Sequence, residues 1–395
     1  MAFALLPALG LIAPLLTLPA ITTKFGAPAW AAVAVGQAAG AMGATVLELG
    51  WNWNGPMRVS RASEERRRQY LSLSLRTRAT VFPLVAAVSG VVAALVSPAH
   101  HTVAAAVAVG SALIGFSSVW FFVGIGKPWL AVSTDAAPRA VLALASAIAI
   151  QFADAPLLLY PVLALITPGC ATVILSMVVT RARLRDSAAF GWRRVISLIS
   201  AQRGVIAARA VSATYMQLPV LIVATLLTVH PAALFAAGDR LARLTLSALA
   251  IVPNVFQRYV GTPPVRADRM RRARVAVLAN VGLGLVAGTA FATLSPHLSR
   301  LLFSDEATLS HAEGAFLGLL ILVVCTSRAT GGISLVVAAN SRALMSSAAI
   351  GAIVGTSLLF PLTTAFGTLG AFAAIVAAEV AVLSTQLLSV RAALS

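Results

Sequence analysis

The chain has 395 residues, of which 59% are hydrophobic and only 10% are charged. Soluble domains are about 45–50% apolar, so this composition, with a mean hydropathy of +0.93, excludes an ordinary soluble protein. The net charge of +17 is divided among several short stretches rather than forming one basic patch, which argues against a nucleic-acid-binding protein.

Apolar segments long enough to cross a bilayer recur along the whole chain. A membrane helix needs about 20 mostly apolar residues. In chain order we expect such helices at 3–21, 30–51, 80–97, 103–124, 138–156, 158–180, 205–229, 232–253, 275–296, 315–338, 346–365 and 368–390. The sequence therefore predicts an all-α polytopic membrane protein with about twelve transmembrane helices.

Basic residues occur in every second gap between these segments. They gather at 58–78, 127–139, 181–203 and 258–274, and the intervening gaps are almost free of them. Cytoplasmic loops retain Lys and Arg, so this alternation predicts a membrane protein with both termini in the cytoplasm. Anionic membrane lipids would lie beside these basic loops. The segment 58–78 is either a solvated loop or an amphipathic surface helix, and we favour the loop.

The longest basic connection near the middle of the chain, 181–203, separates two halves. Each half has six predicted helices, and an even number makes the two halves parallel in the membrane. We therefore expect an N-terminal six-helix lobe at 1–200 and a C-terminal six-helix lobe at 201–395.

Several ionisable residues fall inside the apolar segments, where an unpartnered charge costs several kcal/mol and marks a functional site by default. Of the 29 basic residues, 23 are assigned to cytoplasmic loops and two, Lys24 and Arg300, to external loops. Four arginines remain within or at the edge of predicted helices: Arg209, Arg240, Arg243 and Arg328. A cavity lined by arginine suits an anionic substrate, and phosphate in particular, because guanidinium offers a planar fork of donors.

Two of the acidic residues have a possible partner four positions away. Asp239 can pair with Arg243 on one helix, and Glu48 lies four residues before Asn52. Arg240 has no such local partner, so it either faces water in a cavity or snorkels to an interface.

Motifs of other function classes are missing from the sequence. We find no nucleotide-binding loop, no Ser-His-Asp arrangement and no spacing typical of a zinc site. We therefore expect neither an enzyme nor a metal or other cofactor, and we do not expect ATP-driven transport by this chain alone.

Several stretches, in order along the chain, resemble the Wzx-type polysaccharide flippases of the MATE/MOP superfamily. They are 18–26 (LPAITTKFG), 48–58 (ELGWNWNGPMR), 119–127 (VWFFVGIGK), 238–253, 301–304 (LLFS) and 366–371 (FGTLGA). The resemblance implies two six-helix lobes around a cationic cavity, and alternating access that moves a polyprenyl-diphosphate-linked oligosaccharide across the membrane for surface polysaccharide assembly. A polysaccharide polymerase and other glycan-assembly proteins are the partners that it implies.

The resemblance also indicates which residues contact the substrate. Lys127, Arg240 and Arg243 are carried over as cavity cations. Asn52 and Asn54 are further candidates, although the neighbouring tryptophans could instead mark the membrane interface.

Two alternatives remain open. One is a MATE-like exporter of small molecules, in which Glu48, Asp154 and Asp239 would couple transport to a cation, because the first predicted helix contains no acid. The other is a membrane scaffold of the same fold that transports nothing and whose arginines only snorkel.

Overall fold

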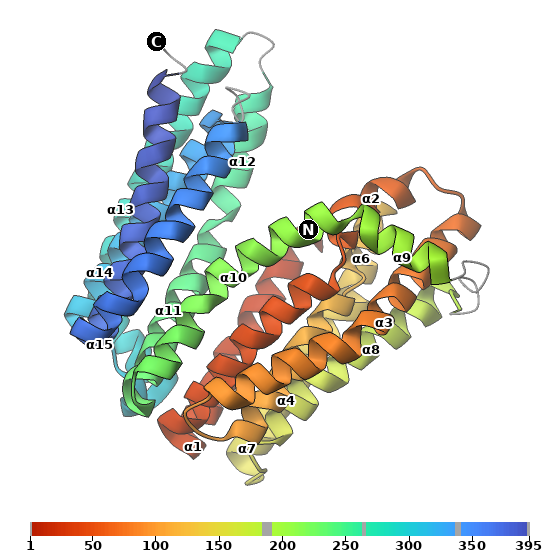
Figure 1. Ribbon diagram of the computed structural model, residues 1–395, viewed down its shortest axis with the longest axis horizontal. Coiled ribbons are helices and arrows are strands. Elements are labelled where there is room, and N and C mark those ends of the chain that lie inside the picture. Colours follow the sequence, from red (N-terminus) through yellow and green to blue (C-terminus); the bar gives the residue numbers. More distant parts are fainter. Residues whose placement is uncertain (1, 184–191, 263–265, 336–340, 393–395) are drawn as a thin grey trace. The chain divides into compact units, whose positions relative to one another are not determined.

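The computed structural model describes residues 2–183, 192–262, 266–335 and 341–392, and all of its elements are helical (Figure 1). The chain forms two compact units, Met1–Thr225 and Leu226–Ser395. The predicted lobes at 1–200 and 201–395 stay a prediction. Parts of three predicted segments lie outside the described residues: 184–191 in the central connection, 263–265 in a basic loop and 336–338 at the end of a helix.

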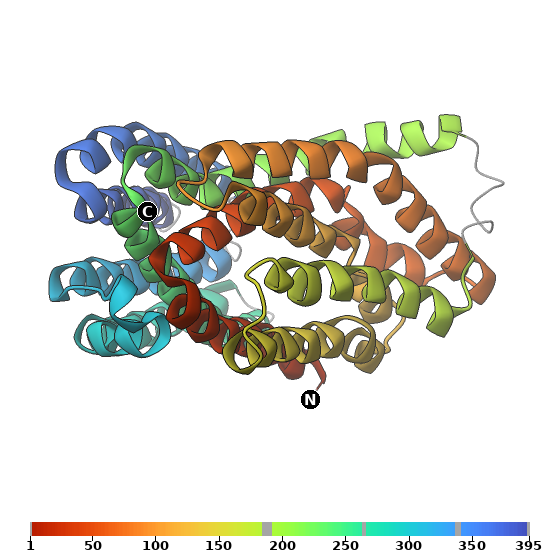
Figure 2. The same ribbon diagram turned by 90° about the horizontal axis from the view of Figure 1, so that it is seen from below.

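The first unit begins with long helices and continues with several short ones. Its elements are α1 (Ala2–Leu47), α2 (Trp51–Ser60), α3 (Glu64–Val96), α4 (His101–Ala112), η1 (Leu113–Phe116), α5 (Val119–Gly124), α6 (Pro128–Ala131), η2 (Val132–Ala136), α7 (Ala137–Phe152), η3 (Pro161–Ile166), α8 (Thr167–Thr180), α9 (Trp192–Ala201) and α10 (Arg203–Leu226). Helix α1 packs against α4, α3 and α7, and α7 also contacts α8 (Figure 2).

The second unit is built on α13, α14 and α15, with α11 packed against α14 and α15. Its elements are α11 (Val229–Leu249), α12 (Ile251–Gly261), α13 (Arg266–Phe303), η5 (Ser304–Ala307), α14 (His311–Ala329), η6 (Thr330–Leu335) and α15 (Ser341–Ala392).

By length and composition, nine helices of the described residues could cross a membrane. Two of the nine regions, in α1 and α15, belong to helices that each contain two of the predicted segments. These helices are broken where Gly26 and Gly367 adopt non-helical backbone angles with φ of 73° and 58°. Only glycine adopts such angles readily. Helix α11 has 21 residues but is not among the nine, since it carries three charged residues in its middle.

Close contacts between glycine-containing helix faces hold each unit together. A Cβ atom at Gly36 would lie 2.5 Å from the carbonyl oxygen of Ala104, and one at Gly40 would overlap the carbonyl of Ala108, so α1 and α4 touch backbone to backbone. Gly288 of α13 and Gly318 of α14 face each other's carbonyls in the same way. Without a hydrophobic driving force inside lipid, such small-residue contacts are what brings helices together.

The segment 58–78 is not a loop. Helix α2 ends at Ser60 and α3 begins at Glu64, so the prediction of a solvated loop was wrong. The sequence carries ordinary helix-start signals here, namely Ser63 followed by the acidic Glu64 and Glu65. Helix α3 has 33 residues and is therefore about 50 Å long, which exceeds the roughly 30 Å of the hydrocarbon core.

Because α3 is longer than the bilayer core, its two ends test the predicted orientation. Cys170 and Cys325 are unpaired and would first be replaced by Ser. A cysteine at Ser63 should then resist an impermeant thiol reagent in intact cells and react after permeabilisation, whereas one at His101 should react in intact cells. Labelling of Ser63→Cys in intact cells would contradict the positive-inside topology.

Candidate functional site

A strained turn presents Glu48 at the end of α1. Leu49 and Gly50, which follow it, both have positive φ, 48° and 73°, and α2 starts at Trp51. Positive φ at a leucine costs about 1–3 kcal/mol and persists only where the surroundings enforce it. Here the Leu49 side chain is buried in a hydrophobic cluster, so the turn is fixed and with it the position of Glu48.

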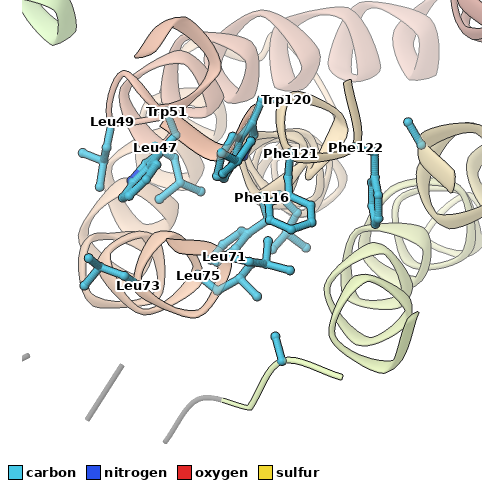
Figure 3. Packing of buried hydrophobic residues seen from close by; sticks show 14 residues of the cluster. Leu47, Leu49, Trp51, Leu71, Leu73, Leu75, Phe116, Trp120, Phe121 and Phe122 are labelled. Atoms are coloured by element: carbon cyan, nitrogen blue, oxygen red, sulfur yellow. The ribbon is translucent and has the colours of Figure 1, made fainter. Parts of the chain in front are cut away.

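Aromatic side chains form the core beneath this turn (Figure 3). The rings of Trp51 and Trp120 lie 5.4 Å apart, and the Trp51 indole N–H donates a hydrogen bond to Thr77 Oγ1 at 3.3 Å. Phe121 packs edge-on against Trp120, with ring centroids 5.7 Å apart. These contacts join the turn to α3 and α5 and so hold the backbone next to Glu48 in place.

The Glu48 carboxylate is paired with two neighbours. Arg209 Nη2 of α10 lies 2.7 Å from Glu48 Oε2, and the side chain of Asn52 hydrogen-bonds the same carboxylate. The expected proximity of Glu48 and Asn52 is thus confirmed. The Glu48 and Arg209 side chains are 17% and 38% exposed, so Arg209 is the more accessible partner.

The second cation beside Glu48 is Arg78, which our sequence analysis missed because it assigned this residue to a loop. Arg78 is 0% exposed. Its Nη1 donates a hydrogen bond to the carbonyl oxygen of Ser117 at 3.0 Å, and the charge of Glu48 acts on its guanidinium. Within the described residues, its Nε and Nη2 have no hydrogen-bond partner. We refer to Glu48, Asn52, Arg78 and Arg209 as the Glu48 cluster; it contains one carboxylate and two guanidinium groups.

A buried hydrogen-bond network holds Ser117, the residue whose carbonyl accepts from Arg78. Asp135, in the π-helix η2, accepts hydrogen bonds from Ser117 Oγ at 2.7 Å, Arg139 Nε at 2.7 Å and Thr172 Oγ1 at 2.8 Å. Ser117, whose carbonyl holds Arg78, is therefore itself held in place. This network links η2, α7 and α8 to α3, and no pattern in the sequence predicted it.

A second group of charged residues, in the other unit, lies on α11 and on the neighbouring α14. Arg243 Nε lies 2.6 Å from Asp239 Oδ2, so the predicted pairing across one helical turn is confirmed. Arg328 of α14 donates a hydrogen bond from Nη1 to the carbonyl oxygen of Leu246 at 2.6 Å. Arg240 is half-buried on the same helix. These residues, Asp239, Arg240, Arg243 and Arg328, form the α11 cluster, with three guanidinium groups and one carboxylate.

The remaining predicted site residues lie elsewhere in the first unit. Lys127 is exposed just before α6, and Asn54 is half-buried in α2. Asp154 is 86% exposed and its Oδ1 lies 2.5 Å from Lys24 Nζ, whose hydrogen bond and positive charge lower the pKa of Asp154. In the described part of the chain, none of these three residues is hydrogen-bonded or ion-paired to Glu48.

No group of three His, Cys, Asp or Glu side chains in the described part of the structure could hold a metal ion.

Gly50 also contacts the helix that carries Arg209. A Cβ at this position would overlap the buried Gln202 Oε1, which lies immediately before α10, and φ is already +73°. Gly50→Ala should therefore destabilise the protein by about 1–3 kcal/mol and lower its melting temperature in detergent, followed by tryptophan fluorescence. Gly204→Ala is the matched control, because no atom lies within 4 Å of its Cβ. Equal melting temperatures for the two variants would contradict this packing.

No protein-family model and no curated protein matches the sequence. The structure is similar to the lipid II flippase MurJ in an inward closed conformation, with a TM-score of 0.69 and 12% identity over 99% of this chain and 86% of that one. It is also similar to an inward-facing multidrug resistance MATE family transporter of the MOP superfamily (TM-score 0.66, 14% identity, 98% of this chain and 94% of that one). A mutant of the Vibrio cholerae MATE transporter VcmN gives a TM-score of 0.51 with 16% identity, over 100% of this chain and 94% of that one. The protein therefore has an all-helical polytopic fold similar to those of the lipid II flippase MurJ and of the MATE transporter.

Proposed function

We propose that this protein is a flippase that moves polyprenyl-diphosphate-linked oligosaccharides across the bacterial cytoplasmic membrane, for cell-surface polysaccharide assembly. In this proposal about twelve membrane-spanning helices form two six-helix lobes around a central cavity, and both termini lie in the cytoplasm. The lobes alternate in opening the cavity to either side. Its partners are the lipid-linked glycan, membrane lipids and, within the cell, a polymerase and other glycan-assembly proteins.

The pairing of the acidic residues carries this proposal. Each of the three acids considered for cation coupling has a basic partner: Glu48 pairs with Arg209, Asp239 with Arg243 and Asp154 with Lys24. A carboxylate that is already neutralised is a poor site for a cationic drug or a metal ion. The guanidinium groups outnumber the carboxylates in both clusters, so the surplus charge favours an anion such as diphosphate.

The similarity to MurJ supports the same class of substrate, since that protein is a lipid II flippase. In the proposed mechanism, arginines of the α11 cluster and Lys127 hold the diphosphate. Asn52 and Asn54 contact the sugar headgroup in the wet cavity, and the polyprenyl tail stays in lipid. Glu48 and Asp239 act in this scheme by orienting the arginines that they pair with.

The matching fold of the MATE transporter supports a second candidate, a cation-coupled exporter of small molecules. In that case Glu48, Asp154 or Asp239 would have to release its basic partner in order to bind the coupling ion. Breaking a partly buried pair leaves an uncompensated charge, which makes this candidate the less favoured of the two.

Reconstituted protein distinguishes these functions. Proteoliposomes would carry a fluorescent polyprenyl-diphosphate disaccharide, whose movement between leaflets is measured by quenching with dithionite. Wild-type protein should accelerate movement, and Arg240→Gln and Arg243→Gln should each slow it at least about tenfold, because each removes a charge-assisted contact. Arg300→Gln, at a 64% exposed side chain, is the control.

The opposite pattern would refute the flippase. Wild-type proteoliposomes that leave the lipid-linked disaccharide in place, but release a preloaded cationic dye when a proton gradient is applied, would establish the exporter instead.

A further inference from the structure

The Glu48 cluster has one more positive charge than it can neutralise internally, and its two arginines differ in freedom. Arg78 is wholly buried and is held by the Ser117 carbonyl, which Asp135 supports. Arg209 is 38% exposed and lies on α10, the candidate membrane span with the least buried surface. Arg209 is therefore the arginine that an incoming anion can reach, whereas Arg78 is fixed in place by its burial and by the Ser117 carbonyl.

The depth of the cluster follows from the length of α3. Arg78 lies about 18 residues before Val96, where α3 ends, which is about 27 Å along a helix that rises about 1.5 Å per residue. The hydrocarbon core is about 30 Å thick. With the basic end of α3 in the cytoplasm, the cluster lies at the inner edge of the hydrocarbon, at the level of the inner-leaflet phosphates.

Glu48 would occupy the place of an anion when no ligand is bound. A carboxylate at the C-terminus of a helix faces the negative end of the helix dipole, and so it needs the cations that surround it. Its geometry toward Arg209, 2.7 Å from Nη2, is that of a carboxylate or phosphate oxygen on a guanidinium group.

We propose that the Glu48 cluster is the loading site for the diphosphate of a polyprenyl-linked substrate in the inner leaflet. Phosphate oxygens displace the Glu48 carboxylate from Arg209, and the positive charge of Arg78 offsets the negative charge of the displaced carboxylate. No covalent bond or proton changes hands in this exchange of partners. The inference rests on the proposed function and assigns Arg78 a positioning role and Arg209 a substrate-binding role at the first step.

Binding of farnesyl diphosphate to the purified full-length protein in phosphatidylcholine nanodiscs tests this exchange. Glu48→Gln removes the competing anion and should tighten binding about tenfold, whereas Arg209→Gln should weaken it at least about tenfold. The double variant should bind as weakly as Arg209→Gln alone. Glu64→Gln and Arg203→Gln are matched controls, because Glu64 is exposed in α3 and Arg203 is exposed at the start of α10.

Two further binding measurements distinguish a diphosphate ligand from an ordinary phospholipid headgroup. Nanodiscs that contain phosphatidylglycerol should leave the affinity for farnesyl diphosphate within about twofold, and inorganic pyrophosphate should compete for the same site. If phosphatidylglycerol abolishes probe binding, the occupant is an ordinary phospholipid and the proposal fails. It fails equally if Glu48→Gln binds the probe no more tightly than wild type, or if Arg209→Gln binds it unchanged.

The readout is binding rather than transport, so the two proposals fail separately. A protein that flips the lipid-linked disaccharide but shows no Glu48-dependent binding would retain the proposed function without this loading site. A protein that binds the probe in the expected way but flips nothing would retain the site and lose the function.

Discussion

The buried guanidinium of Arg78 is the constraint on which the first unit depends. A cation without access to water needs a counter-charge and hydrogen-bond acceptors, since several kcal/mol are lost otherwise. Glu48 provides the charge and the Ser117 carbonyl provides an acceptor. The left-handed turn at Leu49 and Gly50 and the aromatic core around Trp51 fix Glu48 in place, so local strain and packing both serve this one electrostatic requirement.

The two units meet a similar problem in different ways. In the first, the charges come from the turn after α1, from α3 and from α10, and the pairing of Glu48 with Arg209 joins distant parts of the chain. In the second, Asp239 and Arg243 are neighbours on α11, so their pairing is local and independent of other helices. Arg328 of α14 ties α11 to another helix by donating a hydrogen bond to the Leu246 carbonyl.

Much of the fold could be predicted from the sequence because lipid imposes a simple rule: a spanning segment must be apolar and helical. Each predicted span lies at least partly in a helix of the structure, and the Asp239–Arg243 pair followed from spacing alone. Arg78 could not be found in the same way. Its basic neighbours made the segment look like a loop, and its hydrogen-bond partner Ser117 is 39 residues away in the sequence. The pairing of Glu48 with Arg209 was hidden for the same reason.

The glycine contacts between α1 and α4, and between α13 and α14, have a mechanical consequence. No layer of side chains separates these backbones, so the two helices of a pair cannot shift past one another in small steps. Each pair is therefore expected to move as one rigid body. Movement is therefore easier for a helix that only side-chain contacts hold in place. Helix α10, held near Glu48 and Gly50 by Arg209 and Gln202, is such an element, and in the proposed exchange of partners a bound anion would separate it from Glu48.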